Sequence, residues 1–244
     1  MNTIYEATVE LSVLLGHELC DIRFDPQNMQ QRFVMTLYAS TLELGGDAII
    51  LAQRERYSGI PIITRSMLEA CVQMRALIKD AKYYNRMIAT LRAEEIQMAK
   101  NALELNKTLA LDPAYRQELE KRQRDAEEEL RRLGEQGFKR VRIKEAFALA
   151  GVAQWYSPIY STLCSHSHNN LPVLAHRHFE QTEQGWVPVF EREWKPDEVA
   201  LYMANVSMAM KAANDSIIAF FGLSASPRAN ELWAIIEAAT TEKK

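Results

Sequence analysis

The chain has 244 residues with 29 basic and 32 acidic side chains, so no global positive field indicates nucleic-acid binding. Hydrophobic residues make up 48% of it and charged residues 25%, the composition of an ordinary globular protein. Its three cysteines are widely spaced and form no CxxC pair, which predicts reduced thiols and a cytoplasmic location. No apolar run reaches the roughly 18 residues of a membrane span, so no membrane association is expected.

Helical periodicity dominates the first third of the chain. Residues 3–20 predict an amphipathic helix, and the Asp25-Pro26 dipeptide marks the start of a second helix. The segment RYSGIP then breaks the pattern. A third helix, IITRSMLEACVQMRALIK, follows at residues 62–79 and is strongly apolar.

A helical hairpin is predicted over residues 84–135. Apolar residues in its first half, among them Leu91, Met98 and Leu105, recur with the spacing of a coiled-coil seam. Asp112 then supplies an N-cap for the second helix. Because a short connection favours neighbouring antiparallel helices, this segment is expected to project as an arm. The mixed charges of the second helix predict a solvated helix with i,i+4 ion pairs, and the alternative is a surface for a protein partner.

Residues 173–194 change character. They are rich in β-branched and aromatic side chains around a turn signal at residues 182–185, which predicts a β-hairpin. The helix expected from Asp197 to Phe221 is apolar on more than one face, so it must be buried in a core or an interface, and a homodimer is expected. The fold class is therefore mainly α. Residues 1–244 should form one domain, a helical bundle with a projecting antiparallel helical-hairpin arm and one small β-hairpin.

A polar stripe crosses the otherwise apolar third helix. Arg65, Glu69 and Gln73 recur there at four-residue spacing. A charge buried in such a helix must be paired, or it costs several kcal/mol. Two interpretations are open: an internal Arg65–Glu69 pair that fixes the helix register, or a cleft in which the stripe faces a histidine.

Four of the five histidines lie within residues 166–178. On the helix that ends near residue 168, Tyr160, Cys164 and His168 share one face at four-residue spacing. His166 should point elsewhere, which predicts a surface position. The shared face is the candidate partner of the polar stripe.

The second pair of histidines has the spacing of a strand. In an extended strand, His176, His178 and Glu180 would share one face, as the ligands of a two-histidine, one-carboxylate metal site do. The alternative is a polar, solvent-facing side of a hairpin with no metal.

A resemblance supports the polar stripe. The segments RSMLE at 65–69 and YSTLCSHSHNN at 160–170 resemble an uncharacterised bacterial helical family, known only as a domain of unknown function, with the pattern R-S-hydrophobic-x-E followed by Y-x-x-L-[SC]-x-x-x-H. Cys164 stands where that family usually has Ser. The family's helical build is similar to RNase-like domains of bacterial toxin and antiphage systems. Their R-x4-6-H motif has no counterpart at His166 or His168.

Three functions follow as hypotheses. In the first, a cytoplasmic protein of bacterial stress or phage-defence type binds a phosphate-bearing ligand or RNA in a cleft of Arg65, Glu69, Tyr160 and His168. Arg65 would hold phosphate, and His168 would act as acid or base. The second is a non-enzymatic homo-oligomeric interaction protein in which the polar stripe is structural. The third is a metal-dependent hydrolase that uses the hairpin histidines. No cofactor is indicated.

Overall fold

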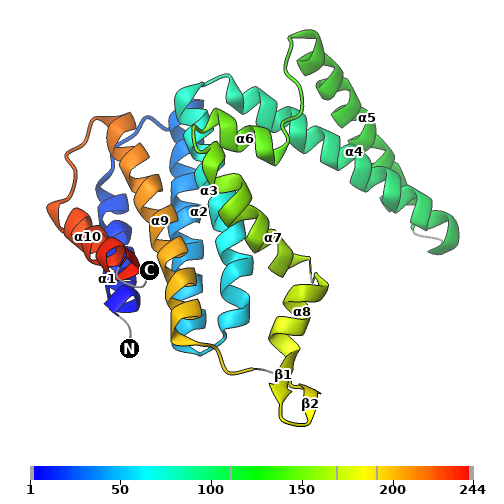
Figure 1. Ribbon diagram of the computed structural model, residues 1–244. Coiled ribbons are helices and arrows are strands. Elements are labelled where there is room, and N and C mark those ends of the chain that lie inside the picture. Colours follow the sequence, from blue (N-terminus) through cyan, green and yellow to red (C-terminus); the bar gives the residue numbers. More distant parts are fainter. Residues whose placement is uncertain (1–2, 110–111, 169, 191, 242–244) are drawn as a thin grey trace. The chain divides into compact units, whose positions relative to one another are not determined.

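The computed structural model describes residues 3–109, 112–168, 170–190 and 192–241, and it is mainly α-helical with one two-stranded antiparallel hairpin, as predicted (Figure 1). The helices are α1 (Thr3–Asp21), α2 (Met29–Gln53), α3 (Ile60–Lys79), α4 (Tyr83–Leu109), α5 (Pro113–Glu135), α6 (Ile143–Leu149), α7 (Ser161–Ser167), α8 (Leu171–His178), α9 (Pro196–Phe221) and α10 (Pro227–Thr241). The strands are β1 (Phe179–Thr182) and β2 (Gly185–Pro188).

The chain divides into two compact units. The larger joins Met1–Lys79 to Phe147–Lys244, and the smaller is Asp80–Ala146. The larger unit contains α1 to α3, α7 to α10 and the hairpin. All residues of the candidate site belong to it.

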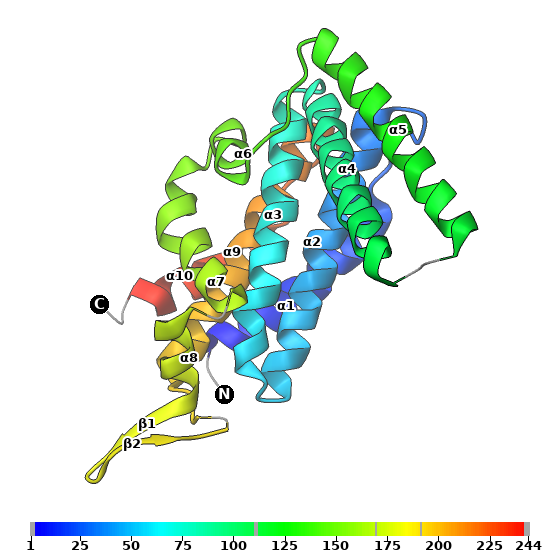
Figure 2. The same ribbon diagram turned by 90° about the vertical axis from the view of Figure 1, so that its right-hand side faces the viewer.

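α9 is the central helix of the larger unit. It packs against α1, α2, α3 and α10, and it lies between the α1–α10 pair on one side and α2 and α3 on the other (Figure 1). Figure 2 shows the same helices from the side. Met203, Val206, Met210 and Ile217 are fully buried on it. This central place accounts for an apolar surface on more than one side of α9. Association of two chains stays a prediction.

α2 is also a core helix. By length and composition it is apolar enough to cross a membrane, contrary to the expectation that no such segment occurs. It packs along α3 and α9 and buries Val34, Tyr38 and Ala48 completely. The buried helix of a bundle passes the same test.

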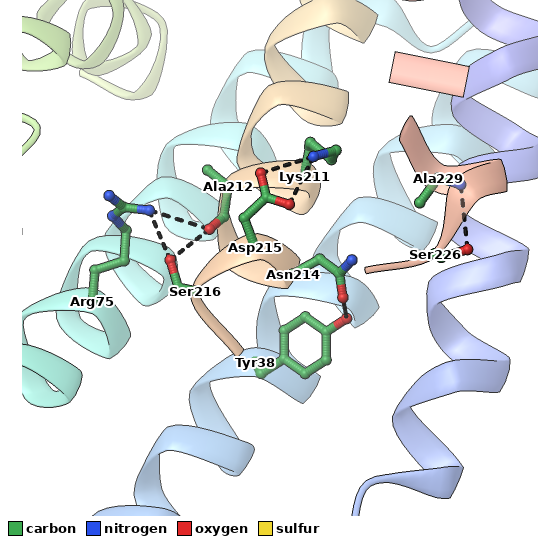
Figure 3. A network of polar contacts seen from close by, with 9 residues as sticks. All are labelled: Tyr38, Arg75, Lys211, Ala212, Asn214, Asp215, Ser216, Ser226 and Ala229. Atoms are coloured by element: carbon green, nitrogen blue, oxygen red, sulfur yellow. Dashed lines mark hydrogen bonds and ion pairs between the residues drawn. The ribbon is translucent and has the colours of Figure 1, made fainter. Parts of the chain in front are cut away.

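Polar side chains join α9 to its neighbours inside this core (Figure 3). The Tyr38 hydroxyl of α2 donates to Asn214 Oδ1 at 2.8 Å, and both side chains are buried. Arg75 of α3 donates to Ser216 Oγ at 2.7 Å and to the Ala212 carbonyl at 3.2 Å. Buried polar groups must be paired, so these bonds fix the register of α9 against α2 and α3.

The smaller unit is built on the α4–α5 pair. Arg92 of α4 binds Glu129 of α5 at 2.5 Å, and Ala89 and Ala99 are buried along α4. The predicted seam residues Leu91, Met98 and Leu105 are exposed instead, so the expected seam position is wrong. Small alanine side chains allow α4 and α5 to approach closely. The stripe of α4 that contains Ala89 and Ala99 is therefore buried, and the stripe with Leu91, Met98 and Leu105 is exposed.

The hairpin is shorter than predicted. Its strands cover residues 179–188, whereas residues 173–178 of the expected strand form the end of α8. Asn170 is the N-cap of α8 and Pro172 lies in its first turn. Pro is well suited to a helix start, and this local signal prevailed over the β-branched Val173.

Candidate functional site

Three of the predicted site residues meet between α3 and the start of α7. The Arg65 guanidinium lies 2.8 Å from the Glu69 carboxylate on the same helix. The Tyr160 hydroxyl donates to Glu69 Oε1 at 2.5 Å and accepts from Arg65 Nη2 at 3.2 Å. Arg65 Nε donates to Cys164 Sγ at 3.3 Å. We call these four side chains the Arg65 cluster.

Two aromatic rings, of Phe147 and Tyr156, pack against Tyr160. It ends a π-helical turn, Tyr156–Tyr160, that leads into α7. Its ring lies 5.5 Å from the Tyr156 ring and 5.0 Å from the Phe147 ring. The ring is buried while the hydroxyl reaches the α3 charges. Tyr160 is therefore pre-positioned as a hydrogen-bonding partner for α3.

The electrostatics of the Arg65 cluster keep the Tyr160 phenol and the Arg65 guanidinium protonated. Burial and the bonded Glu69 carboxylate raise the pKa of Tyr160, so its phenol stays protonated. Partial burial opposes the charge of Arg65, but the Cys164 contact and the Glu69 carboxylate outweigh it and raise the pKa of Arg65. Because Nε and Nη2 of Arg65 already bind Cys164, Tyr160 and Glu69, that edge of its guanidinium is occupied and is poorly placed to hold a phosphate.

His168 does not join the cluster. On α3, Tyr160 contacts both Glu69 and Arg65, whereas Cys164, one turn later, contacts Arg65. α7 therefore runs antiparallel to α3, and its next turn passes the cluster. His168 is the C-cap of α7, and its exposed ring has no bond to any side chain that the structure describes. The expected acid or base is thus absent from this cluster.

His166 occupies the buried position instead. It is only 5% exposed, and its Nε2 lies 3.2 Å from the Tyr202 hydroxyl of α9. Its Nδ1 is buried without a partner in the described part of the chain. Burial, followed by the charges of Arg177 and His176, lowers the pKa of His166. The expectation of a surface position for His166 is wrong, because α9 covers that side of α7.

The predicted metal ligands do not share a face. His176 and His178 lie in the last turn of α8, two residues apart and therefore on different sides, while Glu180 lies in β1. His176 Nε2 is 2.6 Å from Arg192 Nη2, where a guanidinium would repel a cation. Across the described ranges, no group of three or more His, Cys, Asp or Glu side chains could hold a metal ion. The strand geometry assumed for this triad is wrong.

A pocket that sequence reasoning missed lies between the end of α8, the segment just before α3 and the segment after β2. Its volume is about 280 Å³, and we call it the arginine pocket. It is lined by Arg56, Ser58, Arg177, His178, Phe190, Arg192 and Trp194. Three arginine side chains thus line one hollow, and no acidic residue is among the described residues that line it.

Arg192 is fixed in this pocket by two neighbours, Trp194 and Glu198. Its guanidinium lies 4.6 Å from the centre of the Trp194 ring and donates to Glu198 Oε2 at 2.6 Å. Its side chain is only 10% exposed. Partial burial opposes ionisation of Glu198, but the bonds from Arg192 and the Lys195 backbone outweigh it and lower its pKa. A stacked and paired guanidinium of this kind is held in one orientation.

Arg177 lacks such a partner. Its side chain is half-buried, and its Nε is buried without an acceptor. Within the described residues no carboxylate or carbonyl oxygen accepts from its guanidinium. A half-buried, uncompensated cation costs free energy that a bound anion would offset.

By fold and site, the molecule is a mainly α-helical protein with a paired Arg–Glu–Tyr cluster and an arginine-lined pocket. The chain belongs to a family of unknown function, DUF5677, which matches residues 31–185. The matched span contains the Arg65 cluster and Arg177, whereas Arg192 and Trp194 follow it. Among curated proteins and solved structures, none matches this chain.

Proposed function

We propose that the protein binds a phosphate-bearing ligand, and that the ligand occupies the arginine pocket rather than the Arg65 cluster. The observation that carries the proposal is Arg177, a half-buried guanidinium with no acceptor among the described residues. Arg56 and Arg192 line the same hollow. Arginine forks match phosphate oxygens in geometry as well as in charge.

The Arg65 cluster has a different part in this proposal. Its cation is already paired with Glu69, and its phenol is bonded to both. Such a network joins α3 to the start of α7, and α8 with Arg177 follows α7 along the chain. In this proposal the polar stripe of α3 is structural, and the ligand site is the arginine pocket.

The test uses inorganic pyrophosphate as the probe. Binding to the wild-type chain should raise the unfolding temperature, because a ligand of the folded state stabilises it by mass action. Arg177→Gln removes one charge-assisted contact, worth about 1.5–3 kcal/mol, and should weaken binding at least tenfold. Titration calorimetry measures the dissociation constants.

Arg124→Gln is the matched control. Arg124 is an exposed arginine of α5, in the other unit, so the same charge is lost without touching the pocket. It should bind pyrophosphate as the wild type does. Equal weakening in both variants would mean that binding follows net charge alone. A wild-type chain that binds no pyrophosphate at millimolar concentration would overturn the proposal.

A further inference from the structure

One face of the hairpin carries two exposed aromatic rings. The β1–β2 register pairs Phe179 with Pro188 and Gln181 with Trp186, and residues directly opposed in an antiparallel pair point to the same side. The Phe179 side chain is 43% exposed and Trp186 is 65% exposed. Both views show the hairpin beyond the end of α8 (Figures 1 and 2). Large aromatic rings gathered in water are typical of a binding surface.

This face is continuous with the arginine pocket. Arg177 and His178 directly precede β1, and Arg192 follows β2 by four residues. The His178 carbonyl accepts from the Val189 N–H at 2.8 Å, which closes the base of the hairpin beside the pocket. A four-residue strand spans about 13 Å, so the Trp186 ring lies within roughly that reach of the arginines.

We propose that the pocket and the hairpin face together bind single-stranded nucleic acid, with its phosphates at the arginines and a base stacked on Trp186. This inference rests on the proposed phosphate site. A nucleotide strand carries anions and planar rings at alternating positions, which is the chemistry that this surface complements. Because every base has a flat face, stacking requires no particular sequence. In a duplex the bases are stacked on one another, so Trp186 would find no partner there.

The polar side chains of the hairpin argue against a lipid surface as the occupant. Exposed Glu180 and Glu183 lie on β1 and in the turn, and Gln181 shares the face of Trp186. A segment that inserts into an anionic bilayer needs a continuous apolar face bordered by basic residues. Anionic headgroups would repel the Glu183 carboxylate in the turn and the Glu180 carboxylate on the opposite face of the hairpin. A nucleic-acid strand, by contrast, would place a base at Trp186 and its phosphates at the arginine pocket.

The experiment measures the binding of a labelled oligouridylate of about 12 nucleotides by fluorescence anisotropy. Trp186→Ala should weaken binding roughly 5- to 150-fold, the range expected for one stacked base. Trp186→Phe retains a flat ring and should restore most of the affinity. Ile50→Ala, an exposed apolar residue of α2 at 55% exposure, is the control and should bind as the wild type does.

Parallel titrations separate the two proposals. Pyrophosphate affinity should be unchanged in Trp186→Ala, because the hairpin face is not part of the phosphate site. If pyrophosphate binds but the oligouridylate does not, or if Trp186→Ala binds it normally, the nucleic-acid inference is wrong while the phosphate site stands. Equal affinity for a duplex of the same length would also contradict it. Trp186-dependent binding to phosphatidylglycerol vesicles, with no oligouridylate binding, would identify a lipid surface instead.

Discussion

Replacing His166 by alanine should destabilise the larger unit, whereas the same change at His168 should not. His166 is 5% exposed and bonded to Tyr202, while His168 is exposed and free of side-chain bonds in the described structure. The lost hydrogen bond accounts for about 1 kcal/mol. The lost edge-to-face contact with the Tyr202 ring, at 5.7 Å and 89°, adds about 1 kcal/mol, and the cavity adds about 1 kcal/mol.

One contribution has the opposite sign. The substitution also removes the unpartnered Nδ1, which returns about 1 kcal/mol. The net expectation for His166→Ala is therefore a loss of about 2 kcal/mol in the free energy of unfolding. For a chain of this size that corresponds to about 4–8 °C in unfolding temperature. His168→Ala should stay within about 0.5 kcal/mol.

Urea unfolding at pH 8, followed by circular dichroism, measures both variants with neutral imidazoles. A loss in His168→Ala as large as that in His166→Ala, or no loss in either, would refute the burial argument.

The pH dependence provides a second measurement of the same residue. Since the pKa of His166 is lowered in the folded chain, the unfolded chain takes up the proton more readily. The stability contribution is then complete above the ordinary pKa of 6.5 and is lost as the pH falls below it. His166→Gln should lose less stability than the wild type between pH 8 and pH 5.5. Identical pH profiles would contradict the lowered pKa.

Three other predictions follow from the contacts described above. Asn214→Ala leaves the buried Tyr38 hydroxyl without its acceptor and should cost about 1–3 kcal/mol by urea unfolding, so a neutral result would contradict the network in Figure 3. Tyr160→Phe removes the bond to Glu69 and should lower stability by about 1–2 kcal/mol without changing pyrophosphate affinity; weakened binding with intact stability would instead make the cluster a ligand site. Sulfate keeps the same charge from pH 8 to pH 5.5 and should bind the arginine pocket more tightly at the lower pH. Burial and nearby cations disfavour protonation of His166, and a bound anion would offset the effect of the cations. Weaker sulfate binding at pH 5.5 by calorimetry would exclude this link between His166 protonation and anion binding.

The helices could be predicted from the sequence because their signals are local. The Asp112 cap and the apolar period of α3 each act within a few turns, and the structure has a helix at each. The meeting of Arg65 with Tyr160 was also expected, from two four-residue repeats on two helices. In each case the interactions that determine the structure lie within one helix or between the facing sides of two helices.

The burial of His166 and the arginine pocket depend on contacts between segments that are far apart in the sequence. Which side of α7 is buried is decided by Tyr202, which lies on α9 and has no sequence pattern in common with His166. The arginine pocket gathers Arg56, Arg177 and Arg192 from three separate segments, so no motif marks it. The start of α8 depends on local signals, Asn170 at the N-cap and Pro172 in the first turn, which prevail over the β-branched composition that predicts a strand.

The larger unit is formed by two stretches of chain with the smaller unit between them, and this order affects synthesis on the ribosome. α3 ends at Lys79 and its packing partner α9 begins at Pro196, with the smaller unit and the hairpin between them. At 5–20 residues per second, roughly 6–23 s pass between the emergence of the two helices. During that interval the faces of α1, α2 and α3 that α9 will cover remain open to water. The nascent chain thus presents an unfinished apolar surface for seconds, which makes it a natural client for chaperones that bind such surfaces.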